Sequence, residues 1–257
     1  MARPIPLRPL LSAALAVALG APATAGAEEW SFTATPYLWL MGSTGDLEVR
    51  GLEVQVDDSF VDMLQGTDTL IGGFVHLEGR RDGWGFYLEG NYAYTSTEGE
   101  LAGAIDTRVR TGLTVLEAGG LLQVAGGTLG GDPQRAWHIE ATAGVRYVSF
   151  DVKLDLGPAD AQRTLSWTDP VVGLGGKLDL GPNWTLIGHG DIGGFGLGSK
   201  LAANLYALVG YRTEIFGAPV LSTFGYRGLY FDREDDSRNN SADLWLHGPV
   251  LGMTFAF

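Results

Sequence analysis

Hydrophobic and polar residues alternate along most of this chain, in segments separated by clusters of turn-forming residues. Trp184, Leu186 and Ile192 fall on one face of an extended strand. His189 and Asp191 fall on the opposite face. This period of two predicts an all-β protein. Comparable segments lie at residues 30–41, 69–81, 84–97, 107–125, 136–153, 164–180, 200–214, 219–232 and 242–257.

The segment 136–153 shows what its two faces could contact. One face is apolar from Trp137 to Tyr147, with an aromatic residue at each end, and the other carries His138, Glu140 and Arg146. An apolar strip that ends in aromatics suits a lipid-facing surface, while the charged strip suits a wet or ion-paired lumen. A soluble β-sandwich would bury the apolar face instead, and periodicity alone does not separate the two.

The N-terminal residues 1–27 predict a secretory signal peptide. Arg3 and Arg8 precede an apolar run from Leu10 to Leu19, and small residues follow it. This run is about half of the roughly 20 residues that a transmembrane helix needs. The mature protein, residues 28–257, is therefore expected to be exported as one domain. Removing two arginines and no acid changes its net charge from −13 to −15.

The C-terminus favours the membrane barrel over the sandwich. Leu251, Met253, Phe255 and Phe257 alternate with smaller or polar residues up to the terminal phenylalanine. This pattern resembles the closing strand of Gram-negative outer-membrane barrels, whose aromatic end is an assembly signal for the barrel-assembly machinery. We therefore predict a transmembrane antiparallel β-barrel with an up-and-down meander, located in the outer membrane.

Turn positions predict the number of strands. Tight turns at 81–83, 181–183 and 216–219 fall on one side, expected to be periplasmic, and the loop 232–240 falls on the other. Residues 42–68 form an outer excursion with a short hairpin about residues 50–51 and a possible helical turn at 60–64. Because each hairpin arm is too short to span a bilayer, we expect ten spanning strands, or twelve if the arms extend.

Composition limits the chemistry. A chain this acidic is not expected to bind nucleic acid, because it cannot replace the counterions of the phosphates. It has no cysteine, and its four histidines lack metal-ligand spacing, so no cofactor or metal is expected. The acidic residues at 232–236, with Asp57, Asp58 and Asp62, lack the spacing of a calcium loop. A solvated loop is favoured over a cation site shared with lipopolysaccharide phosphates. Outer-membrane lipid and lipopolysaccharide are the expected surroundings, and the oligomeric state stays open.

Five motifs resemble a largely uncharacterised family of proteobacterial outer-membrane β-barrel proteins. They are Thr35-Pro-Tyr-Leu-Trp-Leu40, Trp167-Thr-Asp-Pro170, Gly190-Asp-Ile-Gly-Gly-Phe-Gly196, Gly225-Tyr-Arg227 and Gly248-Pro-Val-Leu-Gly252. The resemblance covers nearly the whole mature chain and implies a porin-like barrel fold. It supplies no substrate and no catalytic residues.

Inward-facing charges are the candidate site. Opposite charges in a narrow lumen should pair, because an unpaired ion there is costly. His189 and Asp191 also resemble half of a general-base apparatus, but the sequence places no nucleophile beside them. The glycine-rich run 190–198 lacks the context of a phosphate loop and is better explained by wall geometry. As speculative binding residues of the interior we select His189, Asp191, Arg146, Glu140, Arg212 and Arg227; other predicted inward charges are Glu78, Arg80, Glu89, Lys177 and Asp179.

The leading functional hypothesis is a non-enzymatic outer-membrane barrel of structural or porin-like type, whose lumen is filled largely by ion-paired side chains and passes small solutes slowly at most. One alternative is a barrel hydrolase that acts on lipid or peptide, with His189 as base and Asp191 as its orienting group. Another is a surface interaction protein that binds through its outer loops.

Overall fold

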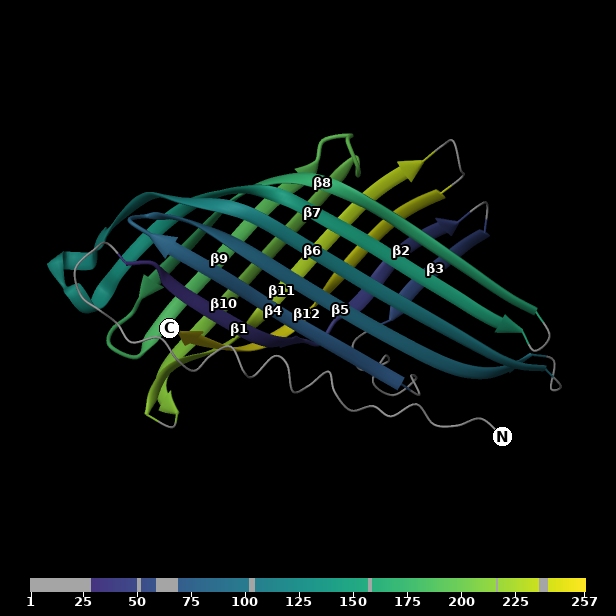
Figure 1. Ribbon diagram of the computed structural model, residues 1–257, viewed down its shortest axis with the longest axis horizontal. Helices are drawn as coiled ribbons and strands as arrows, with labels where there is room; N and C mark the ends of the chain where they lie inside the picture. Colours follow the sequence, from purple (N-terminus) through teal and green to yellow (C-terminus); the bar gives the residue numbers. More distant parts are fainter. Residues whose placement is uncertain are drawn as a thin grey trace.

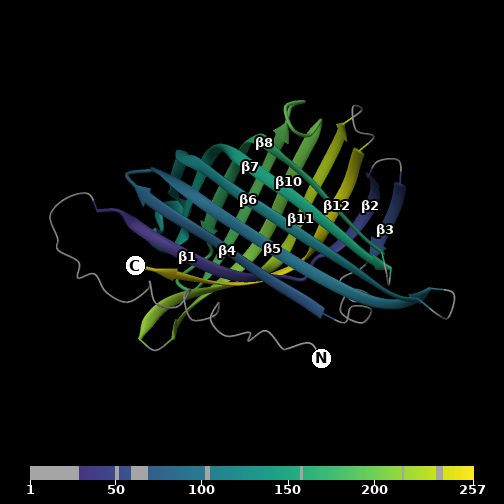
Figure 2. The same cartoon turned by 45° about the vertical axis from the view of Figure 1, so that its right-hand side comes forward.

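The computed structural model describes residues 29–49, 52–58, 69–101, 105–156, 159–215, 217–235 and 240–257. Within these ranges twelve strands form one antiparallel sheet, which closes where β1 pairs with β12 (Figures 1 and 2). The predicted antiparallel barrel is confirmed. No helix among the described residues is long and apolar enough to cross a membrane. The predicted signal peptide, the hairpin turn at 50–51 and the segment 60–64 lie outside the described residues.

The elements follow the chain with short connections. They are β1 (Ser31–Trp39), β2 (Gly42–Val49), β3 (Leu52–Asp58), β4 (Thr69–Arg81), β5 (Trp84–Leu101), β6 (Ile105–Thr128), the 3-10 turns η1 (Leu129–Gly131) and η2 (Pro133–Arg135), β7 (Ala136–Leu156), β8 (Ala159–Asp179), β9 (Trp184–Gly194), β10 (Leu201–Ile215), β11 (Ala218–Asp235) and β12 (Asn240–Ala256).

Ten strands of the described chain, β1 and β4 to β12, close the barrel in sequence order. β1 pairs with β12 from Thr33 to Trp39, and β2 continues along β12 from His247 to Asn240. Among the described strands, β3 pairs with β2 alone. The β2–β3 hairpin therefore continues the pairing of β1 along the same side of β12. This agrees with the expected ten spanning strands and a short added hairpin.

The two ends of the barrel differ. At one end, the turn end, lie the connections β4–β5, β6–β7, β8–β9 and β10–β11 together with the C-terminus (Figure 1). The tight turn between β4 and β5 places Asp82 and Gly83 at positive φ, 50° and 80°. At the other end, the loop end, β5 to β8 extend far beyond their neighbours, since β6 has 24 residues and β9 only 11.

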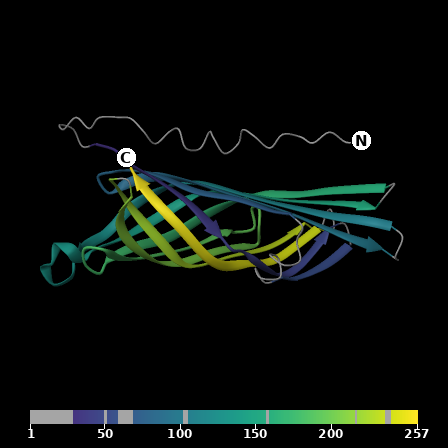
Figure 3. The same ribbon diagram turned by 90° about the horizontal axis from the view of Figure 1, so that it is seen from below.

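The sheet separates into two layers toward the loop end. β8 pairs with β9 only from Val171 onward toward the turn end, so residues 159–170 pair with β7 alone. β4 pairs with β1 only as far as Phe74 with Tyr37. Beyond these points β5–β8 form one layer, and β10–β12 with the β2–β3 hairpin form the other (Figures 1 and 3). Strand pairing between the layers is therefore interrupted at both of these positions in the described chain.

An apolar core fills the space between the layers. Leu229 and Phe231 of β11 are at most 1% exposed, and Trp167 of β8 meets Phe231 edge-on with ring centroids 5.5 Å apart. The expectation of a lumen filled largely by ion-paired side chains is thus wrong for the loop half. The two layers lie close enough for apolar side chains to pack without water, as in a sandwich. The core consists of Trp39, Ala93, Leu113, Val115, Val148, Phe150, Leu165, Trp167, Ala202, Leu229, Phe231, Ala242, Leu244, Leu246 and Val250.

The outward face carries a belt of exposed apolar side chains around the turn half. Leu174 and Leu205 are 60% and 65% exposed, which is unfavourable in water and suited to acyl chains. Aromatic clusters border this belt on both sides. The cluster at the turn end comprises Trp30, Phe32, Trp84, Phe86 and Phe257, and the other comprises Tyr226, Tyr230, Trp245 and His247. This surface is that of an outer-membrane β-barrel, as predicted.

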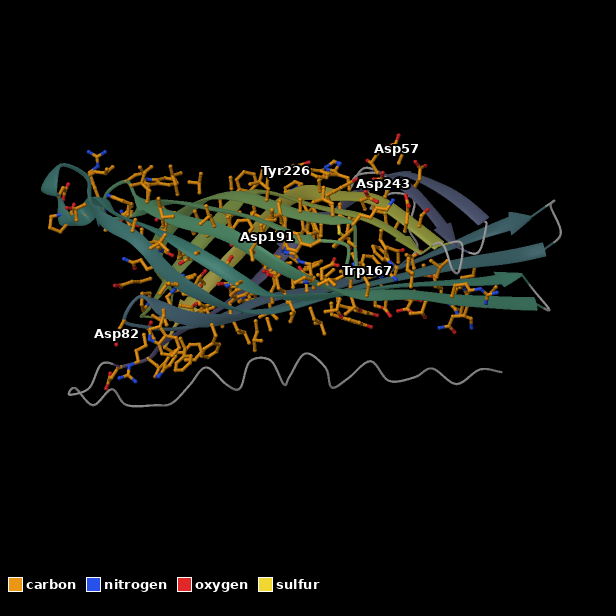
Figure 4. All side chains as sticks on the ribbon, turned by 90° about the horizontal axis from the view of Figure 1, so that it is seen from above. Asp57, Asp82, Trp167, Asp191, Tyr226 and Asp243 are labelled. Carbon is orange, nitrogen blue, oxygen red and sulfur yellow. The ribbon has the colours of Figure 1, made fainter. Side chains whose placement is uncertain are left out.

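Beyond the second aromatic cluster the outward face becomes polar. On β8, exposed Val172 and Leu174 give way to exposed Ser166 and Thr168 nearer the loop end. Asp243 projects outward from β12 in the same region (Figure 4). The loop half therefore has a water-facing exterior around an apolar interior.

Candidate functional site

The barrel interior holds all six residues selected from the sequence. β7 supplies Glu140 and Arg146, β9 supplies His189 and Asp191, and β10 and β11 supply Arg212 and Arg227. Four of the six meet in one hydrogen-bonded cluster at mid-barrel. Glu140 joins a second cluster nearer the turn end, and Arg212 lies in a separate ion pair there.

Arg146 lies at the centre of the first cluster. It is 0% exposed, and its guanidinium donates to Glu117 at 2.7 Å and to Asp191 at 2.8 Å. The hydroxyl of Tyr87 donates to Glu117 at 2.7 Å. Figure 4 places Asp191 about midway along the barrel, between Asp82 at the turn end and Trp167 toward the loop end. Two carboxylates around one guanidinium compensate the cost of burying these charges.

Arg227 forms the second centre, on the other side of the interior. Its Nη1 donates to Glu89 at 2.6 Å and to the Tyr37 hydroxyl at 2.8 Å, and its guanidinium lies 4.8 Å from the centroid of the Trp39 ring. Asn204 links the two centres, because it accepts from Arg227 at 3.0 Å and donates to Asp191 at 2.8 Å.

We call these residues the central network. It crosses the interior of the barrel. It starts at β6 and β7, continues over β9, β10 and β11, and ends at β1 and β5. Its members are Tyr37, Tyr87, Glu89, Glu117, Arg146, Asp191, Asn204 and Arg227.

Two arginines nearer the turn end also form ion pairs. Arg80 bonds to Glu78 and, at 2.6 Å, to Glu140. Arg212 donates to Asp179 at 2.5 Å. These contacts are ion pairs of the kind expected from the sequence. The partners Tyr37, Tyr87, Glu117 and Asn204 were not selected, although the period of two already places Glu117 and Asn204 on inward faces.

His189 and Asp191 are in contact inside the barrel, where their spacing on one strand face placed them. His189 Nε2 lies 3.2 Å from Asp191, whose carboxylate also binds Arg146 and Asn204. The His189 ring stacks on Tyr206, with centroids 5.3 Å apart. Among the described residues that line the adjacent cavity there is no serine to act as nucleophile. These contacts hold the His189 ring in place, and the hydroxyl groups of the described pocket wall belong to threonine and tyrosine.

A cavity of about 430 Å³ lies on the turn-end side of the central network. Its lining residues Thr33, Gln123 and Thr254 lie within a few positions of the turn end. We call it the interior pocket. Its wall combines ion-paired groups with an apolar patch of Ile187, Leu208, Leu221 and Val250, and it ends at Tyr37 and Arg227. No group of histidine, aspartate and glutamate among the described residues is arranged to hold a metal ion.

The sequence motifs meet in space and have structural roles. Asp169 is fully buried and accepts hydrogen bonds from Trp167 at 2.9 Å and from the backbone and hydroxyl of Ser199 at 2.6 Å each. Gly198 packs against Asp169 with no room for a Cβ, and Gly194 and Gly196 have positive φ. The glycine-rich run thus forms the end of β9 and a tight turn held to β8, which agrees with the wall-geometry interpretation.

Comparison with known proteins gives structural neighbours only. No family model matches the chain. No curated protein matches its sequence. The crystal structure of Ail, the attachment invasion locus protein of Yersinia pestis, in complex with the heparin analogue sucrose octasulfate is 14% identical, with a TM-score of 0.35 over 90% of this chain and 100% of Ail.

Two other solved structures give similar or lower values. Neisserial surface protein A is 10% identical, with a TM-score of 0.33 over 89% of this chain and 97% of that protein. A mutant of the TodX monoaromatic hydrocarbon channel is 8% identical, with a TM-score of 0.21 over 90% of each chain. The fold is accordingly established by the strand pairing given above, and membership of the family named from the motifs stays a prediction.

Proposed function

We propose that this protein is an outer-membrane barrel that is closed to through passage and binds a small solute in its interior pocket from the periplasmic side. The turn end is assigned to the periplasm because tight turns lie on that side in outer-membrane barrels. The pocket then opens to the periplasm, and the polar exterior of the loop half faces the cell's surroundings.

The observation that carries the proposal is the double closure of the interior. The central network crosses the barrel from wall to wall, and the apolar core lies directly beyond it. Passage of a solute would require both the ion pairs and the core to separate. A pocket of this size with convergent polar groups and an apolar patch is typical of small-molecule binding sites. We therefore propose solute binding in place of the slow solute passage that the sequence suggested.

The proposed role is non-catalytic. Asp191 is bonded to Arg146 and Asn204, so its charge serves the central network as well as His189. A hydrolase of this kind would need a nucleophile within hydrogen-bond reach of His189. The interior pocket offers threonines but no serine among its described lining residues.

Planar-bilayer recordings of the purified barrel test the closure. We expect no steady single-channel currents from the wild-type protein, because two sealing layers block the path of ions. Steady current steps that scale with barrel insertion would overturn the proposal and restore the porin-like hypothesis.

Single-cysteine variants test the pocket itself, since the chain has no cysteine of its own. Thr254→Cys lies on the pocket wall, whereas Ala202→Cys lies in the apolar core at 0% exposure. A charged thiol reagent should label the Thr254→Cys variant and leave the folded Ala202→Cys variant unreacted. Equal rates at both positions would show that the core does not seal the interior.

A surface-interaction role is the second candidate, favoured by an unpaired strand edge. Residues 159–170 of β8 hydrogen-bond to β7 on one side and to no described strand on the other. This edge lies beyond the lipid belt and has exposed Ser166 and Thr168 on its outward face. An extended segment of a partner protein could add to such an edge. The edge is distant from the pocket, so the two roles can be tested separately.

A further inference from the structure

Lys177 is the one cation of the interior pocket that forms no ion pair with the described residues. It projects from β8 into the pocket, opposite His138 on β7 and Ile187 on β9. The other two cations of the pocket wall are bonded, Arg80 to Glu78 and Glu140 and Arg227 to Glu89. An ammonium group inside a barrel is costly unless an anion or water compensates it. Lys177 is thus free to bind a ligand anion.

Both carboxylates next to Lys177 are bonded to other groups. Asp179, two positions along β8, accepts from Thr185 at 2.6 Å and from Arg212 at 2.5 Å. Glu140 is a diagonal neighbour of Lys177, since His138 pairs with Lys177 and Glu140 pairs with Gly175. Glu140 bends over Gly175, where a Cβ would meet its side chain at 3.0 Å, and bonds to Arg80 at 2.6 Å. Glycine at position 175 therefore lets Glu140 turn away from Lys177.

The same wall also offers carboxylate acceptors. Glu78 and Glu140 share the guanidinium of Arg80, and the rings of His76 and His138 lie 3.7 Å and 3.8 Å from them. Each carboxylate has several acceptor sites, and Arg80 does not occupy all of them. The pocket thus presents an unpaired ammonium and, beside it, a carboxylate pair with spare acceptor capacity.

We infer that the interior pocket binds a small zwitterion with an apolar part, such as an α-amino acid with an aliphatic side chain. Its carboxylate would bind Lys177, its ammonium would bind the Glu78 and Glu140 pair, and its side chain would lie on the apolar patch. A plain anion would meet the Glu78 and Glu140 carboxylates, and a plain cation would meet Lys177. The inference rests on the proposed function of the pocket.

Calorimetric titration of the barrel in lipid nanodiscs, with empty nanodiscs subtracted, tests this assignment. The probes are leucine, N-acetylleucine and leucinamide, which share one side chain and are a zwitterion, an anion and a cation. We expect saturable binding of leucine and affinities for the other two that are about tenfold weaker or more, because each loses one charge-assisted contact.

Two lysine variants form a matched pair. Lys177→Met keeps the length of the side chain but removes the charge, and should weaken leucine binding about tenfold or more. Lys200→Met makes the same change of net charge at an exposed lysine that pairs with Glu234 near the loop end, and should leave leucine binding unchanged. Unchanged leucine binding by the Lys177→Met variant would overturn the assignment, as would equal binding of N-acetylleucine.

The Thr254→Cys variant separates failure of this inference from failure of the proposed function. We expect leucine to slow its labelling by a charged thiol reagent. If the cysteine is labelled and leucine neither binds nor protects it, the zwitterion assignment is wrong although the pocket is open to solvent. If the cysteine is not labelled at all in the folded protein, the pocket is not accessible and both proposals are wrong.

Discussion

The turn half and the loop half of this barrel are built from the same strands with opposite distributions of polarity. In the turn half, apolar side chains such as Leu174 point outward and charged groups such as Lys177 point inward. In the loop half of the same strand, Ser166 points outward and Trp167 is buried inside. The strand direction and the pleat do not change between these positions. The medium outside, hydrocarbon or water, determines which face carries the apolar residues.

The change occurs at a common level across the barrel. On each of five strands, a buried polar residue and a buried apolar residue occupy neighbouring positions on the inward face. The apolar residue is the one nearer the loop end. The central network is therefore the inner boundary between the halves. It pairs its charges before the apolar core begins, and Arg146 Nη1 is left without a hydrogen-bond partner among the described residues. The five pairs are Asn91 and Ala93, Glu117 and Val115, Arg146 and Val148, Asn204 and Ala202, and Arg227 and Leu229.

The strongest way to break this comparison is to place a charge on each side of the boundary. On β12, Leu246 is 3% exposed in the apolar core, and Thr254 lines the pocket. Leu246→Glu should cost more than about 4 kcal/mol, because it buries an unpaired carboxylate and removes core packing. Thr254→Glu should cost about 1 kcal/mol, mainly for its hydrogen bond to Thr35.

Urea unfolding in detergent, followed by the heat-dependent gel mobility of the barrel, measures both variants. A Leu246→Glu protein with a free energy of unfolding within about 1 kcal/mol of wild type would show that water reaches the loop-half interior. If both variants lost a similarly large free energy of unfolding, the interiors of the two halves would not differ in polarity.

A second, smaller effect sharpens the comparison on the outward face. Val172 is 47% exposed within the lipid belt, and Ser166 is exposed on the same face of β8 beyond it. Val172→Lys should lower the free energy of unfolding in bilayers by about 2–4 kcal/mol, because lysine is costly against hydrocarbon. Ser166→Lys should change it by less than about 0.5 kcal/mol. Equal effects in bilayers would remove the argument that the belt faces lipid and the β8 extension faces water.

The sequence predicts the strands and the facing of their side chains better than it predicts the interior. A period of two is a local property, so it correctly placed Arg146 and Arg227 inward and Val145 and Tyr147 outward. Contacts such as Arg227 with Glu89 depend on which walls face each other after closure. The Arg227–Glu89 contact joins residues 138 positions apart, so no pattern of neighbouring residues predicts it.

The sequence does contain a signal for the apolar core of the loop half. In the segment 136–153 the apolar positions are odd up to Tyr147 and then become even at Val148 and Phe150. In the segment 164–180 they change from odd at Leu165 and Trp167 to even at Val172 and Leu174. Each change marks where the exterior passes from lipid to water. The change is lost when a whole strand is assigned a single polar face.

The smallest expected effect on stability concerns the turn end and the predicted assembly signal. Phe257 is 56% exposed, stacks on Phe32 with centroids 6.2 Å apart, and exchanges two backbone hydrogen bonds with it. Phe257→Ala keeps the backbone bonds and should cost about 1 kcal/mol or less in refolding experiments. Phe32→Ala removes the same ring contact from β1 without changing the C-terminus. If the terminal ring is an assembly signal, only Phe257→Ala should reduce the amount of folded barrel in outer-membrane fractions of cells. Equal yields of the two variants would mean that the ring serves only the aromatic cluster at the turn end.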